Sequence, residues 1–155
     1  YYTGARRGEV YQLTWEDIDF EAKTIRLWTK KRAGGHREYD LIPLVTELHN
    51  ILLKWKAEQP VETEYLFLNM KPQSAGYMKP FTDRIRFMRK ICKQAGVKYF
   101  GFHAIRHLTA TQLFHAGQPV HVVQQMLRHK NPNTTARYLH SLGLNKALQA
   151  IDGTL

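Results

Sequence analysis

One β-hairpin, followed by a change from strand periodicity to helix periodicity, is the feature that most limits the fold of this chain. Residues 24–29, TIRLWT, alternate between two faces as a half-buried strand does, and residues 37–44, REYDLIPL, run back after a Gly34-Gly35 pair. Two glycines between such segments are typical of a hairpin turn. We therefore expect an antiparallel pair here, with a third strand supplied by residues 17–20, DIDF.

Helical periodicity accounts for most of the remaining chain. A short helix is expected from about Ala5 to Leu13, before the hairpin, and another after Pro43, ending at the EQP of residues 58–60. The brief apolar segment EYLFLN, residues 64–69, reads as a strand or an extended segment, and MKPQSAGYMKP after it reads as a loop.

The C-terminal half predicts a series of helices with identifiable ends. Thr82 is expected to cap a helix that Gly96 ends, HAIRHLTATQLFHAG is the next helix, and PVHVVQQMLRH follows with Val120, Val123 and Leu127 on one face. An Asn133 or Thr134 cap would then start a further helix, and the tail offers a last amphipathic turn or two. The predicted fold class is α+β, mainly α-helical with a small N-terminal antiparallel β-sheet.

Charge is the most informative property of the composition. The 155 residues suit one domain, and 23 Lys and Arg against 13 Asp and Glu give a formal net charge of +10. Such an excess attracts polyanions, above all nucleic acid. No apolar run approaches the roughly 18 residues of a membrane span, so no membrane segment is expected. The single cysteine, Cys92, excludes an internal disulfide, fits a reducing compartment and reads as an ordinary helix residue.

A few isolated positions carry unusual chemistry, although each has an ordinary explanation. An arginine at a helix start (Arg6) can bind an anion, or it can simply pair with Glu9 at the surface. His103 and Arg106 are three apart on one helix face and could hold one phosphate, or they could be a core histidine beside a surface arginine. The remaining three positions are Lys30, His129 and Tyr138. Taken alone, Lys30 is an ordinary residue of a basic turn, His129 is a histidine favoured at a helix C-terminus, and Tyr138 is a packing residue.

The order and spacing of these residues change the interpretation. The segments TGARRGEVYQLTWEDID, TIRLWTKKRAGGHREYDLIPL, FHAIRHLTAT and VVQQMLRHKNPNTTARYLH together resemble the tyrosine recombinases of the phage integrase family, over nearly the whole chain. One departure is Arg128, which stands where the family usually has glycine. It implies either an altered backbone or an extra cation facing DNA.

The resemblance implies a reaction in which Tyr138 attacks a DNA phosphodiester to form a 3′-phosphotyrosine, without nucleotide, metal or other cofactor. It also implies that Arg6 and Arg106 clamp the phosphate oxygens and that His129 donates a further hydrogen bond. His103 would assist proton transfer, and Lys30 would be the general acid for the leaving 5′-oxygen.

Three further positions take secondary roles. Strand register favours Lys30 over Lys31 as the acid, although a bulge could shift the register. Glu9 is expected behind the site, holding Arg6 or the His103 helix. Lys31, Arg32 and Arg128 are candidate DNA contacts.

The resemblance also predicts the setting of the reaction. Residues 1–155 form one catalytic domain, expected to be a fragment that lacks its first helices and the N-terminal core-binding domain, because the chain opens without Met inside a helix signal. The expected partners are double-stranded DNA attachment sites and a homotetramer on synapsed DNA, with the free fragment a monomer, in the bacterial cytoplasm and on the nucleoid when bound. The leading function is site-specific DNA strand exchange (recombinase or integrase) by an enzyme of a prophage or similar mobile element. The alternatives are a DNA-relaxing topoisomerase of the same chemistry and an inactive DNA-binding relic.

Overall fold

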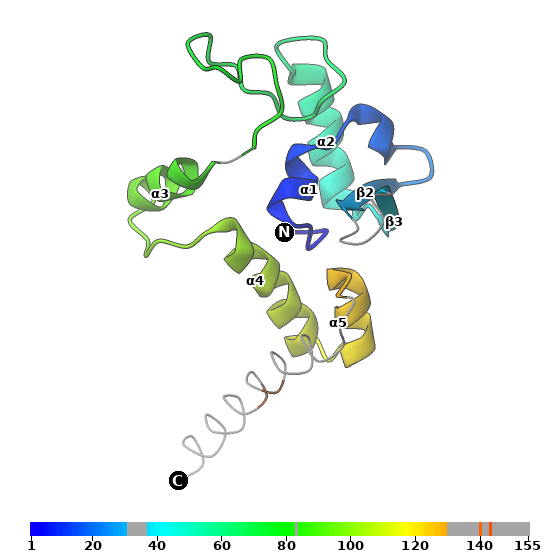
Figure 1. Cartoon of the computed structure of the whole chain (residues 1–155). Coiled ribbons are helices and arrows are strands. Elements are labelled where there is room, and N and C mark those ends of the chain that lie inside the picture. Colours follow the sequence, from blue (N-terminus) through cyan, green and yellow to red (C-terminus); the bar gives the residue numbers. More distant parts are fainter. Residues whose placement is uncertain (31–36, 83, 130–139, 141–142, 144–155) are drawn as a thin grey trace.

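The computed structural model describes residues 1–30, 37–82, 84–129, 140 and 143. In chain order its elements are α1 (Arg7–Tyr11), the 3₁₀ helix η1 (Trp15–Asp17), β1 (Ile18–Asp19), β2 (Thr24–Lys30), β3 (Arg37–Pro43), α2 (Thr46–Glu58), α3 (Ile85–Gln94), α4 (Phe102–His115) and α5 (Val120–Leu127). The fold class is α+β, as the sequence predicted (Figure 1). Among the described helices, none combines the length and the apolar character needed to cross a membrane.

The three strands form one antiparallel sheet in the order β1-β2-β3. Ile25 of β2 is the partner of Ile18 on one side and of Ile42 on the other, and all three are buried. Alternation along β2 therefore places one face on the core, as the pattern TIRLWT predicted. Lys30, the last residue of β2, pairs with Arg37 across the hairpin.

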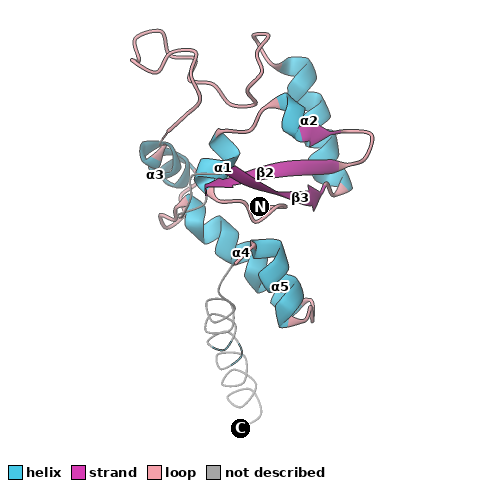
Figure 2. Ribbon diagram, turned by 45° about the vertical axis from the view of Figure 1, so that its right-hand side comes forward, coloured by secondary structure: helices cyan, strands magenta, loops and turns pink. Residues whose placement is uncertain are grey.

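Two apolar clusters hold the elements together. The larger joins the core face of the sheet to α2, where Leu52 packs with Ile25 and Leu27, the last of which is fully buried. The smaller lies between α4 and α5 and is built on Ala110 and Val123. Figures 1 and 2 both show α5 beside α4 and α1 near one end of β2, and Arg106 of α4 donates to the oxygen of Gly4, just before α1. The start of the chain is thus surrounded by elements distant from it in sequence.

Some predicted helix details are wrong. The helix of residues 85–94 is capped by Arg84 and not by Thr82, because Arg84 has φ −143° and ψ 40° and the helical backbone begins only after it. Val120 is 45% exposed, because the apolar cluster reaches only the later turns of α5. The first helix, α1, spans only Arg7–Tyr11. The helix predicted after Asn133 and the tail fall outside the described residues.

Candidate active site

The N-terminus of α1 presents Arg6 with its backbone and its side chain both held by Glu9. Arg6 is the N-cap, with an extended backbone (φ −74°, ψ 146°). Oε2 of Glu9 accepts a hydrogen bond from the Arg6 backbone N–H at 2.7 Å, and Oε1 accepts one from Arg6 Nη1 at 2.9 Å. The Glu9 side chain is only 7% exposed, whereas that of Arg6 is 43% exposed. The carboxylate therefore fixes a guanidinium that still reaches solvent.

The same carboxylate joins α1 to two other parts of the fold. Thr29 Oγ1, on β2, donates to Glu9 Oε1 at 3.1 Å, and Arg128 Nη2, just after α5, donates to Oε2 at 2.5 Å. Burial alone would raise the pKa of Glu9, but the hydrogen bond and charge of Arg128 and the two hydrogen bonds from Arg6 outweigh it and lower that pKa. Glu9 is therefore an ionised crosslink at neutral pH and not a proton acceptor.

Arg106, on α4, lies in the interior beside the α1 N-terminus and is only 5% exposed. Its Nη1 donates to the backbone oxygen of Gly4 and its Nη2 to that of Leu127. Burial, followed by the charges of Arg6 and Arg128, lowers the pKa of Arg106 to about 10. It therefore stays protonated at neutral pH. Within the described part of the chain, two carbonyls use two of its five N–H donors, so this part leaves the group capacity for an anion.

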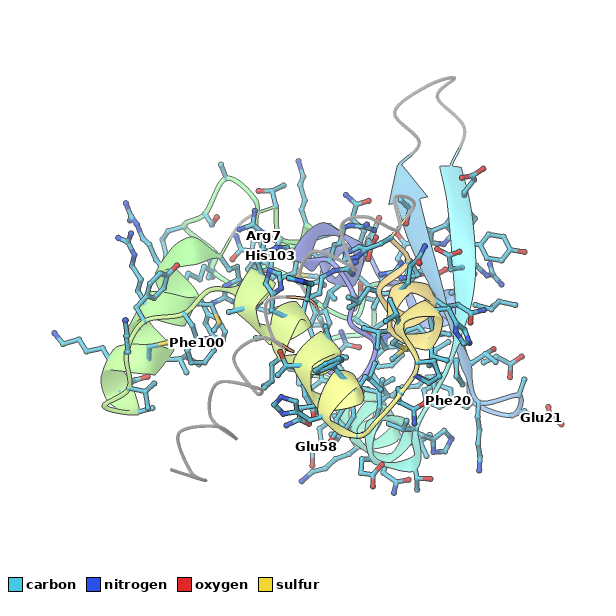
Figure 3. All side chains as sticks on the ribbon, turned by 90° about the horizontal axis from the view of Figure 1, so that it is seen from below. Arg7, Phe20, Glu21, Glu58, Phe100 and His103 are labelled. Carbon is cyan, nitrogen blue, oxygen red and sulfur yellow. The ribbon has the colours of Figure 1, made fainter. Side chains whose placement is uncertain are left out.

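His103 is the second residue of the same helix and is exposed, whereas Arg106 is buried. This reverses the ordinary expectation of a core histidine beside a surface arginine. Figure 3 shows His103 in the first turn of α4, with Arg7 of α1 close to it in this view. One turn later His107 contacts it edge to face, with ring centroids 4.4 Å apart. Burial, then the charges of His103 and Arg106, lower the pKa of His107.

His129 lies two residues beyond the end of α5 and completes the cluster. Gln124 Nε2 donates to its backbone oxygen at 3.4 Å. Burial, then the positive charges of Arg106 and Arg6, lower the pKa of His129 to about 4, and smaller contributions come from His107 and His103. His129 is therefore a neutral imidazole at pH 7. Its sensitivity to these four groups shows that they share one electrostatic environment.

The structure thus brings together five of the residues singled out in the sequence: Arg6, Glu9, His103, Arg106 and His129. Lys30 is placed only by its backbone, at the end of β2 and directly after Thr29. Tyr138, Lys31 and Arg32 fall outside the described residues. Their roles remain predictions.

Arg128 is not the cation facing DNA that was one of the two interpretations of its departure from the family pattern. Its backbone has the left-handed conformation (φ 53°, ψ 44°), and its side chain is 6% exposed against Glu9. A guanidinium enclosed in this way does not form a surface cation facing DNA, because the buried carboxylate holds it inward.

Sequence reasoning missed Thr29 and His107. Both are adjacent to predicted site residues, Thr29 to Lys30 and His107 to Arg106, but pairing a hydroxyl with Glu9 requires the tertiary fold. Within the described part of the chain, no three His, Cys, Asp or Glu side chains gather as metal ligands would. What the cluster offers is three guanidiniums and neutral imidazole donors around one carboxylate, which suits a phosphate or another oxyanion.

Comparison with known proteins agrees with this chemistry. The model of the phage integrase family matches residues 1–143. The tyrosine recombinase XerC-like protein of Caldanaerobacter subterraneus subsp. tengcongensis is 31% identical over 177 residues, covering 93% of this chain and 44% of the relative. A putative integrase/recombinase, y4rF of Sinorhizobium fredii, is 32% identical and covers 88% and 32%.

Solved structures show the same fold. The XerA recombinase superposes with a TM-score of 0.68 at 27% identity, over 90% of this chain and 48% of XerA. The XerH site-specific recombinase, bound to its palindromic difH substrate after cleavage, gives 0.69 at 25% identity, over 97% and 43%. The chain spans less than half the length of each of these relatives.

Proposed function

Because this chain belongs to the phage integrase family, we propose that it is the catalytic part of a site-specific recombinase, which cleaves and rejoins DNA strands through a 3′-phosphotyrosine. One observation carries the proposal: the positive charges of Arg6 and Arg106, from separate segments, both act on His129, and together with Arg128 they outnumber the one carboxylate among them, Glu9. A fold gains no stability from gathering like charges, so the arrangement is best explained by an anionic ligand.

Attack at phosphorus requires charge stabilisation and two proton transfers. The Tyr138 oxygen would form a bond to the phosphorus of the scissile phosphate as the bond to the 5′-oxygen breaks. Ionising a free tyrosine at pH 7 costs about 4 kcal/mol, from its ordinary pKa of about 10. In this proposal His103 assists removal of the tyrosine proton, and Lys30 supplies a proton to the departing 5′-oxygen.

The described residues fit the role of stabilising the transition state. Arg6 reaches solvent from a position fixed by Glu9, and Arg106 is anchored at both ends of its guanidinium with donors to spare. His129, neutral at pH 7, would donate one hydrogen bond without adding a charge. Donors fixed before the substrate arrives need no reorganisation as charge develops on the phosphate oxygens. The phosphodiester bond energy is kept in the tyrosine ester, so the reverse attack by a 5′-hydroxyl can rejoin strands.

The proposed partners are duplex attachment sites and, during strand exchange, three further copies of the protein on synapsed DNA. The formal charge of +10 supports binding to a duplex, and XerH has been solved on its own DNA site. We place the reaction in a mobile element of a bacterium, with the protein in the cytoplasm or on the nucleoid.

A suicide substrate tests the chemistry. The protein in its full natural length is incubated with a nicked duplex that carries its attachment site, and covalent adducts are resolved on a denaturing gel. An adduct is expected with the wild type and not with Tyr138→Phe. The mechanism is wrong if the wild type forms none, or if Tyr138→Phe still forms one.

The same material separates the alternatives. Relaxation of a supercoiled plasmid that lacks any attachment site would favour a topoisomerase. Specific binding to the attachment site without adduct formation would indicate an inactive DNA-binding relic.

A further inference from the structure

The end of α5 has an unusual residue at a position that favours glycine. Arg128 has φ 53° and ψ 44°, the left-handed conformation in which a side chain meets a steric penalty that glycine does not. Its N–H still closes the helix, donating to the Gln125 oxygen at 3.0 Å. Glycine would serve this backbone better, so the presence of an arginine has to be explained by its side chain.

That side chain is placed where an arginine contributes little to stability. It is 6% exposed, and within the described residues its Nε and Nη1 are buried without a hydrogen-bond partner. The Asp40 carboxylate, on β3, lies 3.9 Å from Nη1 and is itself 52% exposed. Burying a charge with unused donors costs desolvation energy that a single close ion pair offsets only in part.

Among the described residues, the shortest contact of the Arg128 side chain is with Glu9, the residue that holds Arg6. Its Nη2 donates to Glu9 Oε2 at 2.5 Å, across 119 positions of sequence. Its backbone oxygen accepts a hydrogen bond of 3.4 Å from Arg6 Nη2. Arg128 therefore contacts Glu9 and Arg6 at once, and the next residue along the chain is His129.

We propose that Arg128 is a positioning residue of the strand-cleavage site, whose guanidinium holds Glu9 in place and keeps the charge of Arg6 available to the phosphate. This inference rests on the proposed function. Without Arg128 the Arg6–Glu9 pair would carry no net charge, and Glu9 would be held only by Arg6 and Thr29 among the described residues, whereas the three groups together carry one net positive charge and tie Glu9 to the end of α5. The guanidinium that occupies the glycine position thus serves the site and not the helix end.

Three substitutions separate this role from a purely structural one. Arg128→Gly removes the guanidinium and also the steric penalty of a side chain in the left-handed backbone conformation. Arg128→Ala removes the guanidinium but keeps that steric penalty, and Arg128→Lys keeps the positive charge. Lys54→Gln is the matched control for a lost charge, because Lys54 is 74% exposed on α2. The readouts are the rate of adduct formation on the suicide duplex at saturating protein, and thermal unfolding.

Both Arg128→Gly and Arg128→Ala are expected to cleave about 10- to 100-fold more slowly, which is the loss expected for one hydrogen bond to a charged group. Arg128→Gly should nevertheless unfold at a higher temperature than Arg128→Ala, since only alanine is strained. Arg128→Lys should recover part of the rate, and Lys54→Gln should match the wild type.

The pH dependence of the cleavage rate is a further readout, because a purely structural role of Arg128 in packing would leave it unchanged. The charged groups that face Glu9 are Arg6 before α1, Arg106 on α4 and Arg128 after α5, with Asp40 beyond Arg128. Without Arg128, burial of Glu9 is opposed mainly by Arg6, so the acid limb of the cleavage rate should move to higher pH. Combining Arg128→Gly with Glu9→Gln should cost little more than Glu9→Gln alone, because both remove the same contact.

The outcomes distinguish this inference from the proposed function. If the wild type forms no adduct, the proposed function fails and this inference falls with it. If the wild type forms an adduct and Arg128→Gly matches its rate and pH profile, only the role of Arg128 is overturned. If Arg128→Gly and Arg128→Ala do not fold, Arg128→Lys is the deciding variant. The positioning role of Arg128 would be overturned if Arg128→Lys kept the wild-type rate and pH profile and if Glu9→Gln lowered the rate by the same factor in the Arg128→Lys protein as in the wild type.

Discussion

Thr29 Oγ1 donates a 3.1 Å hydrogen bond to Glu9 Oε1, and this contact links the strand that ends at Lys30 to the helix that Arg6 caps. The hydroxyl is the point where the hairpin is fixed against the rest of the site. Because Glu9 is buried, its carboxylate has no bulk water with which to replace a lost donor.

Replacing this hydroxyl should slow cleavage and also lower the stability of the fold. We expect Thr29→Val, which keeps the side-chain shape, to cost about 1 kcal/mol of unfolding free energy and to lower the rate of adduct formation severalfold. Thr29→Ser, which keeps the hydroxyl, should remain close to the wild type in both. Denaturant unfolding and the suicide-substrate assay measure the two effects, and equal rates for valine and serine would contradict this role.

The two site arginines should respond differently to replacement by lysine. Arg106 bridges two backbone oxygens from a buried position, so Arg106→Lys should lose about 2 kcal/mol of unfolding free energy as well as cleavage activity. The Arg6 side chain is 43% exposed, so Arg6→Lys should change stability by less than about 1 kcal/mol.

The cleavage activity of Arg6→Lys should still fall, because lysine lacks the planar pair of donors that a guanidinium offers to a phosphate. Circular dichroism melts and adduct formation, run side by side, check this separation. A stable Arg106→Lys protein would show that the two carbonyls do not depend on the guanidinium.

His129 should titrate far below an ordinary histidine. Burial and the neighbouring cations lower its pKa to about 4 from the usual value near 6.5. The stability that it contributes is therefore complete above about pH 6.5 and is lost progressively as pH falls toward 4, because the unfolded state binds the proton more readily. NMR titration of the His129 ring in the DNA-free protein measures this directly, and a midpoint near 6.5 would disprove it.

If His129 acts as a neutral donor, an amide should replace it better than a ring without N–H groups. We expect His129→Gln to retain more cleavage activity at pH 7 than His129→Phe, by about tenfold. Adduct formation by the two variants at matched DNA occupancy is the measurement. Equal activities would indicate that the imidazole contributes shape alone.

Gly4 should not tolerate a side chain. Its φ is +55°, and a Cβ there would lie 3.2 Å from Leu127 Cδ2, next to the carbonyl that Arg106 binds. We expect Gly4→Ala to cost about 1–3 kcal/mol. Gly8, inside α1 with open space around its Cα, is the matched control, and Gly8→Ala should raise stability by about 0.5–1 kcal/mol. Thermal unfolding of both variants checks the contrast.

Local pattern was a good guide to the elements. Alternation in TIRLWT and the Gly-Gly turn predicted the hairpin because strand pairing and turn formation depend on neighbouring residues. The left-handed glycines Gly96 and Gly117 marked the ends of α3 and α4 for the same reason. The prediction that Thr82 caps α3 was wrong, because several polar residues near a helix start can take the N-cap position and tertiary packing selects among them.

The sequence by itself determined the order of the elements, the basic charge and the identities of Arg6, His103, Arg106 and His129 as a set with a familiar spacing. Only the tertiary structure decided which of them are buried, and how. It enclosed Arg106 and exposed His103. It also turned Arg128 inward onto Glu9, whereas a cation facing DNA was one of the two interpretations that the sequence left open. Such choices depend on contacts between residues more than a hundred positions apart, whose desolvation and pairing energies no local pattern contains.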